Sequence, residues 1–341
     1  MSVSRLLSAG MEYADAIALH SLSDTDPPWH EVARSLGDAN ARRAHAAVGA
    51  NHVLTATSWF FYASACYRAA QAAMPDDAER WGVYATMVDA FGSAGALRDP
   101  PFEYETVSYD GGIVRMWKIL PPGVSQPATV IVVGGLDGWR EEHEFATRAL
   151  VERGMSVILM EAPGQGQTRM LDGTHLHEGF ERAFSAVIDH LVAEPSVSGQ
   201  VGVWGNSFGG NLAAWAAIAD PRVSAVCVNG GSSRPTEVME HFPEMTAKAE
   251  ALFGVANADE AIAALDRLTL SKGDLERLTA PLLVLHGTAD PIFGMEDAEF
   301  VHSAATSADK TFLLWDDGEH CLYNHPHERN VTIADWFDDR M

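Results

Sequence analysis

The chain of 341 residues is poor in cysteine, and this shortage excludes two kinds of small, cross-linked protein. Its three cysteines, Cys66, Cys227 and Cys321, lie far apart and form no C-x-x-C pair. Neither a disulfide framework nor a zinc knuckle is therefore predicted, and we expect no bound metal. Free, widely spaced cysteines are typical of a reducing compartment, so we expect a cytoplasmic protein.

Basic residues and long apolar runs are also scarce. Lysine and arginine number 23 against 47 acidic residues, which gives a formal net charge of −24. A chain of that charge repels polyanions, so nucleic acid is not an expected partner. No stretch reaches the roughly 20 apolar residues that cross a bilayer, and the first residues lack an apolar run behind a basic leader. We expect no membrane partner, while a homodimer stays open.

Apolar residues are plentiful, at 47% of the chain, which is enough for a sizeable core. Residues 1–102 are rich in alanine with apolar residues at helical spacing, and we predict a helical amino-terminal domain. From residue 103 onward, a hairpin pattern around "YDGG" is followed by short apolar runs that alternate with helical stretches. This rhythm predicts an α/β domain over 103–341, with a mostly parallel sheet, flanking helices and a helical insert at about 233–278.

One short stretch, "GNSFGG" at 205–210, fits the pattern G-x-S-x-G around Ser207. In such a pattern a sharp turn from strand to helix exposes the serine, and the small neighbours let the turn close. Glycine and serine are also ordinary turn residues, so the pattern alone is weak. Here a predicted strand precedes it and a predicted helix follows it, which favours a nucleophile.

A serine hydroxyl needs a base and an anion to orient that base. Asp290 in "HGTADPIF" and His320 in "WDDGEHC" each follow a predicted strand, and the order Ser207, Asp290, His320 suits a catalytic triad. Taken singly, Asp290 fits an ordinary turn before proline, and His320 fits a surface loop that also holds His325 and His327. We favour His320 because it comes first in that loop, directly after a glycine turn.

A triad also requires an oxyanion hole. We predict that the backbone N–H of Phe208, directly after the nucleophile, is one donor, and that of Leu136 in "VVGGLDGW" is the other. Gly135 and Trp139 of the same turn are predicted to contact the substrate. These glycines match neither G-x-G-x-x-G nor a phosphate-binding loop with lysine, so no cofactor is predicted.

With these residues the chain resembles the alpha/beta-hydrolase superfamily over roughly residues 103–341. Within it, the strings "GGLDGWREE", "EAPGQGQT", "GNSFGG" and "HGTADPIF" resemble the branch that contains 2,6-dihydroxypseudooxynicotine hydrolase, the fungal heptaketide hydrolases and the FrsA-like proteins. The resemblance implies that the amino-terminal helices form a lid over the serine. Trp59 and Tyr62 of those helices would then line an apolar cavity, although aromatic residues on helices more often form plain core.

The resemblance also implies a reaction. Known members of the branch hydrolyse carbon–carbon bonds next to carbonyl groups in aryl ketones or polyketides, and an additional carboxylate takes part. Glu237 lies in the corresponding region and is the residue we assign, with Glu240 as its alternative, although a glutamate on an amphipathic helix more often simply faces solvent. The predicted partner is a small apolar or aromatic carbonyl compound. The residues leave open an esterase, thioesterase or amidase, and a cyclase or binding protein in which the serine does no chemistry.

Overall fold

The computed structural model describes residues 1–23 and 26–341. It divides into two compact units, one made of Met1–Tyr104 with Glu141–Ala146 and one made of Glu105–Arg140 with Thr147–Met341. No helix among the described residues is long and apolar enough to cross a membrane. All three cysteines are buried and carry free thiols.

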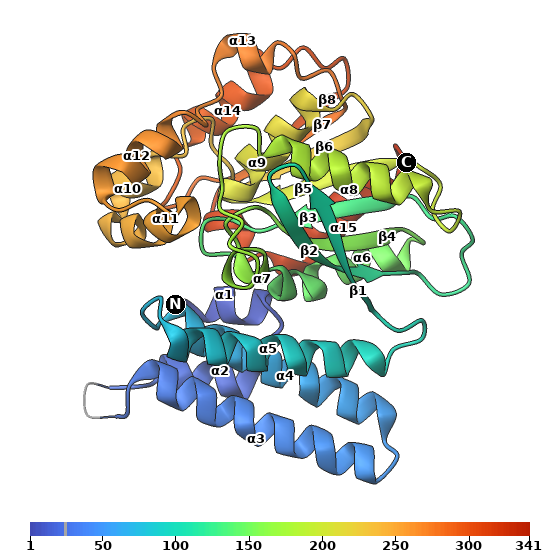
Figure 1. The fold of residues 1–341 in the computed structure, drawn as a ribbon, viewed down its shortest axis with the longest axis vertical. Helices are drawn as coiled ribbons and strands as arrows, with labels where there is room; N and C mark the ends of the chain where they lie inside the picture. Colours follow the sequence, from blue (N-terminus) through green and yellow to red (C-terminus); the bar gives the residue numbers. More distant parts are fainter. Residues whose placement is uncertain (24–25) are drawn as a thin grey trace. The chain divides into compact units, whose positions relative to one another are not determined.

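The first unit is helical, as its alanine-rich pattern predicted. Its helices are α1 (Val3–Ser8), α2 (Tyr13–His20), α3 (Trp29–Gly49), α4 (Val53–Ala72) and α5 (Ala78–Ala96). Helix α4 packs against both α3 and α5, and Figure 1 shows the three side by side. Ala44, Ala56, Ala63 and Ala69 are fully buried, because small side chains let neighbouring helix backbones approach closely. Arg68 on α4 forms a buried ion pair of 2.7 Å with Glu142 of the short segment that joins this unit.

Gly82 offers a simple stability prediction for this unit. It lies on the exposed face of α5, and a Cβ added there would meet nothing within 4 Å. Alanine is a better helix former than glycine, so Gly82→Ala should raise the free energy of unfolding by about 0.5–1 kcal/mol. Chemical denaturation of the full chain measures this. At Gly37, where a Cβ would lie 2.6 Å from the Tyr67 ring, the same substitution should destabilise instead.

The second unit is built on one eight-stranded sheet. Its strands are β1 (Glu103–Tyr109), β2 (Gly112–Ile119), β3 (Thr129–Val133), β4 (Ser156–Glu161), β5 (Val201–Asn206), β6 (Val223–Asn229), β7 (Leu282–Gly287) and β8 (Lys310–Trp315), in the spatial order β1-β2-β4-β3-β5-β6-β7-β8. Strand β2 pairs antiparallel with β4, and every pair from β4 to β8 is parallel. The predicted mostly parallel sheet is confirmed.

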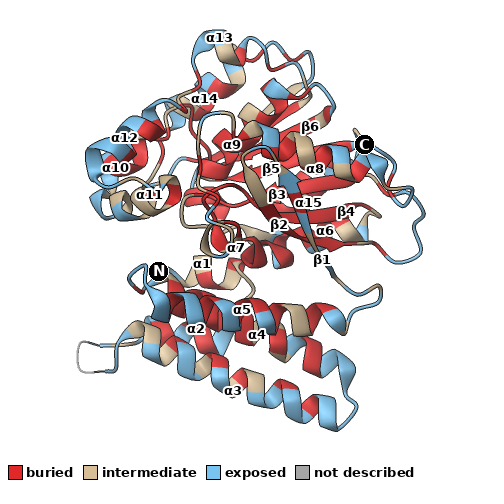
Figure 2. Cartoon of the chain, in the orientation of Figure 1, coloured by how far each residue is buried: buried red, intermediate tan, exposed pale blue. Residues whose placement is uncertain are grey.

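Helices cover both faces of this sheet. They are α6 (Glu144–Glu152), α7 (Gly166–Met170), α8 (Glu181–Ala193), α9 (Phe208–Ala219), α14 (Met295–Ala304) and α15 (Pro326–Asp338). Val203 of β5 shares a core with residues of α8 and α9, whereas a Cβ on the adjacent Gly202 would touch Phe337 of α15. Because successive strand residues face opposite sides, α9 and α15 lie on opposite faces of β5. Figure 2 shows the result, with β3, β4, β5 and β7 buried throughout.

Between β6 and β7 the chain forms a helical insert. It contains α10 (Glu237–His241), α11 (Thr246–Phe253), α12 (Ala258–Asp266) and α13 (Lys272–Leu275). Its buried leucines and alanines, including Leu252, Ala261 and Leu265, join the main core of the sheet domain. The insert is therefore part of the sheet domain and packs onto it.

Candidate active site

The turn between β5 and α9 holds Ser207 in a strained backbone conformation. Ser207 has φ 58° and ψ −130°, a region that residues with side chains rarely occupy. A Cβ at Gly205 would collide with the carbonyl of Gly209. One at Gly209 would lie 2.6 Å from the carbonyl oxygens of Val133 and Gly134. Both glycines are needed for a turn this tight, which presents the serine at the carboxyl edge of the sheet.

Asp290 and His320 form a buried pair at the same edge. Nδ1 of His320 donates to Oδ2 of Asp290 over 2.7 Å, and the two side chains are 10% and 1% exposed. The second carboxylate oxygen accepts from the backbone N–H of Ile292 at 2.8 Å and of Phe293 at 3.2 Å. Burial favours the protonated acid, but the interactions with His320 outweigh it and hold the pKa of Asp290 below its usual value. Asp290 is therefore an anion that can orient the imidazole.

The imidazole of His320 is enclosed, with the residue 8% exposed. Aromatic rings of Phe293 and Tyr323 meet it edge to face, at centroid distances of 5.8 and 6.1 Å. Burial disfavours its charged form, but the neighbouring Cys321 and the Asp290 carboxylate outweigh burial and raise the pKa of His320. Because Nδ1 is bound to Asp290, Nε2 is the nitrogen that can accept a proton.

Asn229, the last residue of β6, connects the His320 segment with the Ser207 turn. Its carbonyl accepts the backbone N–H of Ser207 at 2.9 Å and the thiol of Cys321 at 3.5 Å. Its side-chain Nδ2 donates to the Cys321 carbonyl at 3.3 Å. The residue after His320 thus lies against the same peptide group that holds Ser207. In the part of the chain that the structure describes, no hydrogen bond joins the Ser207 hydroxyl to His320, and the triad remains a prediction.

The predicted oxyanion donors lie on two sides of the serine. Phe208 is the first residue of α9, where the helix dipole contributes partial positive charge. On the other side, a Cβ at Gly135 would lie 2.8 Å from Cβ and 3.0 Å from Oγ of Ser207, so Gly135 contacts the serine directly. Leu136 is the next residue. Among the described residues, no backbone hydrogen bond outside the helices and strands has Leu136 or Phe208 as its donor. Their role as oxyanion donors stays a prediction.

The structure does not place Glu237 on the solvent-facing side of its helix, which was the alternative to a role in the site. It is buried, with Oε1 accepting from the Gly294 N–H at 2.8 Å and Oε2 bonded to Ser232 at 3.2 Å. Burial and the nearby Asp297 carboxylate raise the pKa of Glu237. The contacts of Glu237 reach the loop that follows Asp290 but do not reach Ser207 or His320 themselves. Glu240 is exposed and pairs with Arg234.

The predicted substrate-contacting aromatics fall in both units. Trp139 is buried in the sheet unit, in the turn after Gly135. Trp59 and Tyr62 are half-buried on α4 and meet each other edge to face at 5.7 Å, with the Arg43 guanidinium 4.8 Å above the Trp59 ring. Their role in substrate binding stays a prediction.

One group of described side chains could hold a metal ion: Glu105, His190 and Glu194, whose ligand atoms lie within 4.8 Å of one another. The Lys118 ammonium already lies between the two carboxylates, at 2.7 Å from Glu105 and 2.9 Å from Glu194. This cation balances their charge, so the group is satisfied as an ion-pair network.

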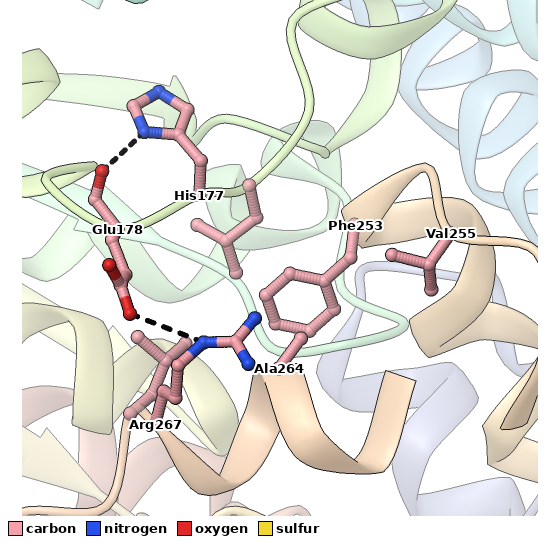
Figure 3. A pocket seen from close by; sticks show the side chains of 8 residues that line it. His177, Glu178, Phe253, Val255, Ala264 and Arg267 are labelled. Carbon is pink, nitrogen blue, oxygen red and sulfur yellow. Dashed lines mark hydrogen bonds and ion pairs between the residues drawn. The ribbon is translucent and has the colours of Figure 1, made fainter. Parts of the chain in front are cut away.

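A cavity of about 480 Å³ opens elsewhere in the sheet unit, next to α11 and α12 (Figure 3). It is lined by Leu176, His177, Glu178, Phe253, Val255, Ala264, Arg267 and Leu268. Its polar groups pair with each other: Arg267 lies 3.2 Å from Glu178, and His177 Nδ1 lies 2.6 Å from the Glu178 carbonyl. None of the candidate catalytic residues lines this cavity, so we do not place the reaction there.

Sequence reasoning missed Asn229 and its partner Asn206. Oδ1 of Asn206 accepts from Nδ2 of Asn229 at 2.7 Å, because the two residues are paired across β5 and β6. The only available signal was that each asparagine ends an apolar strand run, at "VWGN" and "VCVN". A polar residue at the end of a buried parallel strand lies where such sheets place their functional sites.

Comparisons with known proteins identify the family of the chain and several relatives. The model of the prolyl oligopeptidase family matches residues 146–341. The chain is 25% identical over 337 residues to 2,6-dihydropseudooxynicotine hydrolase of Paenarthrobacter nicotinovorans, covering 98% of this chain and 90% of that protein. It is 30% identical over 257 residues to hydrolyase poxO of Penicillium oxalicum, covering 66% of this chain and 58% of that protein.

A solved structure is similar over almost the whole length. The crystal structure of 2,6-dihydroxy-pseudo-oxynicotine hydrolase superposes with a TM-score of 0.89 at 25% identity, covering 99% of this chain and 95% of that one. The similarity extends over the amino-terminal helices as well as the sheet domain. The predicted alpha/beta-hydrolase fold and the resemblance to this branch are confirmed.

Proposed function

The chain belongs to the prolyl oligopeptidase family, and from this premise we propose that it is a serine hydrolase that cleaves a carbon–carbon bond next to a carbonyl group, in an aromatic or polyketide ketone. The observation that carries the proposal is the buried Asp290–His320 hydrogen bond of 2.7 Å beside the strained Ser207 turn. Support for the bond type comes from the similarity to 2,6-dihydropseudooxynicotine hydrolase, which runs through the whole chain, helices included.

In the proposed reaction, Ser207 Oγ attacks the carbonyl carbon while Nε2 of His320 takes the hydroxyl proton. The N–H groups of Phe208 and Leu136 bind the oxyanion. Collapse of the tetrahedral intermediate breaks the carbon–carbon bond, and His320 protonates the departing carbon. Water, activated by His320, then hydrolyses the acyl enzyme to a carboxylic acid.

A carbon leaving group needs stabilisation that an ester does not need. The negative charge on the departing carbon must be spread over a neighbouring carbonyl or a phenol ring, which favours β-diketones and acylated phenols as substrates. Nothing in the triad itself demands such a group. The proposed substrate is therefore a small apolar or aromatic carbonyl compound, and a cytoplasmic location and a homodimer remain predictions.

Two measurements test the proposal together. A fluorophosphonate probe should label Ser207 in the folded protein, as identified by peptide mass spectrometry. The purified chain should then release a carboxylic acid and a phenol from a phenol that carries its acyl group on a ring carbon, which is an aryl ketone and not an ester. Turnover of aryl esters with every acylated phenol and β-diketone left intact would establish an esterase instead. Failure to label Ser207 would favour a cyclase or binding role.

The raised pKa of His320 predicts the pH profile. Only the neutral imidazole can accept the serine proton, so activity is present above this pKa and is lost as pH falls through it. We therefore expect the acidic limb of kcat/KM to have its midpoint above the usual histidine value of 6.5. The profile is measured with an aryl ester whose leaving group does not titrate in the range. A midpoint below 6.5 would show that burial, which lowers the pKa, dominates over the Asp290 carboxylate.

A further inference from the structure

Gln165, in the loop after β4, is bonded to the turn that carries the predicted oxyanion donor. Its Nε2 donates to the carbonyl of Gly134 at 2.8 Å and to that of Gly135 at 2.9 Å. Its Oε1 accepts the N–H of Ala162 at 2.9 Å. The residue is buried, with 6% exposure, and a glutamine amide has two N–H groups to donate. Both are used within the protein, so Gln165 has no donor left for a substrate.

The geometry of the peptide bond connects Gln165 to the oxyanion hole. The carbonyl of Gly135 and the N–H of Leu136 belong to one planar trans peptide, so they point in opposite directions. Because Gln165 holds this carbonyl, the N–H of Leu136 is turned away from Gln165. A hydrogen bond to the carbonyl also polarises the peptide and strengthens its N–H as a donor. Gly135 itself contacts Ser207, so this peptide lies next to the candidate nucleophile.

We propose that Gln165 is a positioning residue that orients the Gly135–Leu136 peptide, so that the oxyanion hole is formed before the substrate binds. The inference depends on the proposed function, in which Ser207 is the nucleophile and Leu136 is an oxyanion donor. It gives a physical reason for two of the sequence strings that carry the family resemblance. "GGLDGWREE" and "EAPGQGQT" are the two loops that Gln165 joins.

Other contacts hold the rest of the turn independently of Gln165. Asp137 is paired with Lys248 of α11 at 2.5 Å. Arg140 is fully buried and bonded to Glu161 at 3.2 Å and to Gln167 at 2.7 Å. The Gly135 carbonyl also accepts the backbone N–H of Gly138 at 3.2 Å. Loss of the Gln165 amide should therefore leave the turn in place and loosen the Gly135–Leu136 peptide without unfolding it. This separates a positioning role from a general effect on folding.

The test is Gln165→Met in the full chain, assayed by aryl ester hydrolysis. Methionine has a similar length but cannot donate, so kcat should fall by about 10- to 100-fold, less than the loss of a whole oxyanion donor. KM should change by less than about threefold, because the oxyanion exists only in the transition state. All rates are expressed per active site titrated with the fluorophosphonate. Gln165→Glu has the same size and still offers an acceptor for the Ala162 N–H, but it has no N–H to donate when ionised. It should likewise lower kcat with little change in KM.

Gln126→Met is the matched control. Gln126 also donates its amide to a backbone carbonyl, that of Pro195 at 3.1 Å, but it is exposed and precedes β3. Its kcat should stay within about twofold of the wild type. An unchanged kcat in both Gln165 variants would overturn the inference, as would a loss fully explained by fewer titratable sites. Absence of labelling in the wild type would instead refute the proposed function, so the two failures are distinguishable.

Discussion

Ser207→Ala is expected to lower kcat by about 10⁶-fold, because alanine has no hydroxyl with which to form the acyl enzyme. The fluorophosphonate should no longer label the protein. The measurement is single-turnover hydrolysis of an aryl ester at enzyme excess. Ser303→Ala, which changes an exposed serine on α14, should keep wild-type activity and labelling. If Ser207→Ala retained more than about a hundredth of wild-type kcat, Ser207 would not be the nucleophile.

At the same position, a glycine variant is expected to be more stable than an alanine variant. At φ 58° a serine or alanine is strained by roughly 1–3 kcal/mol, whereas glycine is not. The greater conformational entropy of glycine in the unfolded chain offsets part of this gain. The free energy of unfolding of Ser207→Gly should therefore be about 1 kcal/mol higher than that of Ser207→Ala. Urea denaturation of both inactive variants gives the comparison. Equal stabilities would show that the turn relaxes around alanine.

Asp290→Asn is the second substitution with a very large expected effect, a fall in kcat of about 10⁴-fold. The side-chain carbonyl oxygen of asparagine can still accept the hydrogen bonds from the backbone N–H groups of Ile292 and Phe293. The NH₂ group of the asparagine then faces Nδ1 of His320. The imidazole must then carry its proton on Nε2, where it cannot accept the proton of Ser207. The loop should stay intact, so the melting temperature should change little compared with the loss of rate.

The chain contains a matched control for this substitution. Asp317 and His325 form a second pair at 2.8 Å in the same region, but the Asp317 side chain is 77% exposed. Asp317→Asn should change kcat by less than about twofold, since an exposed pair contributes little. If both asparagine variants lost activity equally, the effect would come from the loop rather than from the orientation of His320.

Much of the sheet domain could be predicted because its signals are local. Short apolar runs separated by helical stretches indicate parallel strands with helical crossovers, and the protein has these elements. The order of the strands was not predictable in the same way. Strand β3 lies between β4 and β5, and β2 pairs antiparallel with β4, because strand neighbours are chosen by packing between distant segments.

In the candidate site, too, local features could be predicted from the sequence, whereas contacts between distant segments could not. Ser207 and its two glycines could be recognised because a strained turn restricts which residues can stand next to the serine. The environment of Glu237 could not, since helical spacing does not reveal which neighbour covers a given face. Its contacts with Ser232 and Gly294 depend on how the insert packs onto the loop after β7. From the sequence, His320 could be preferred to His325 only by its place in the loop; the structure adds that His320 pairs with Asp290 and His325 with the exposed Asp317.

From its residues alone, this chain could be assigned an alpha/beta fold and a serine turn, because both depend on interactions between near neighbours in the chain. Only the folded protein brings Asp290 to His320, or Asn229 to Ser207 and Cys321. Those contacts depend on strand register, since β6 must end level with β5 for Asn229 to meet Asn206. Register is set by the packing of the whole sheet, which no short stretch of sequence contains.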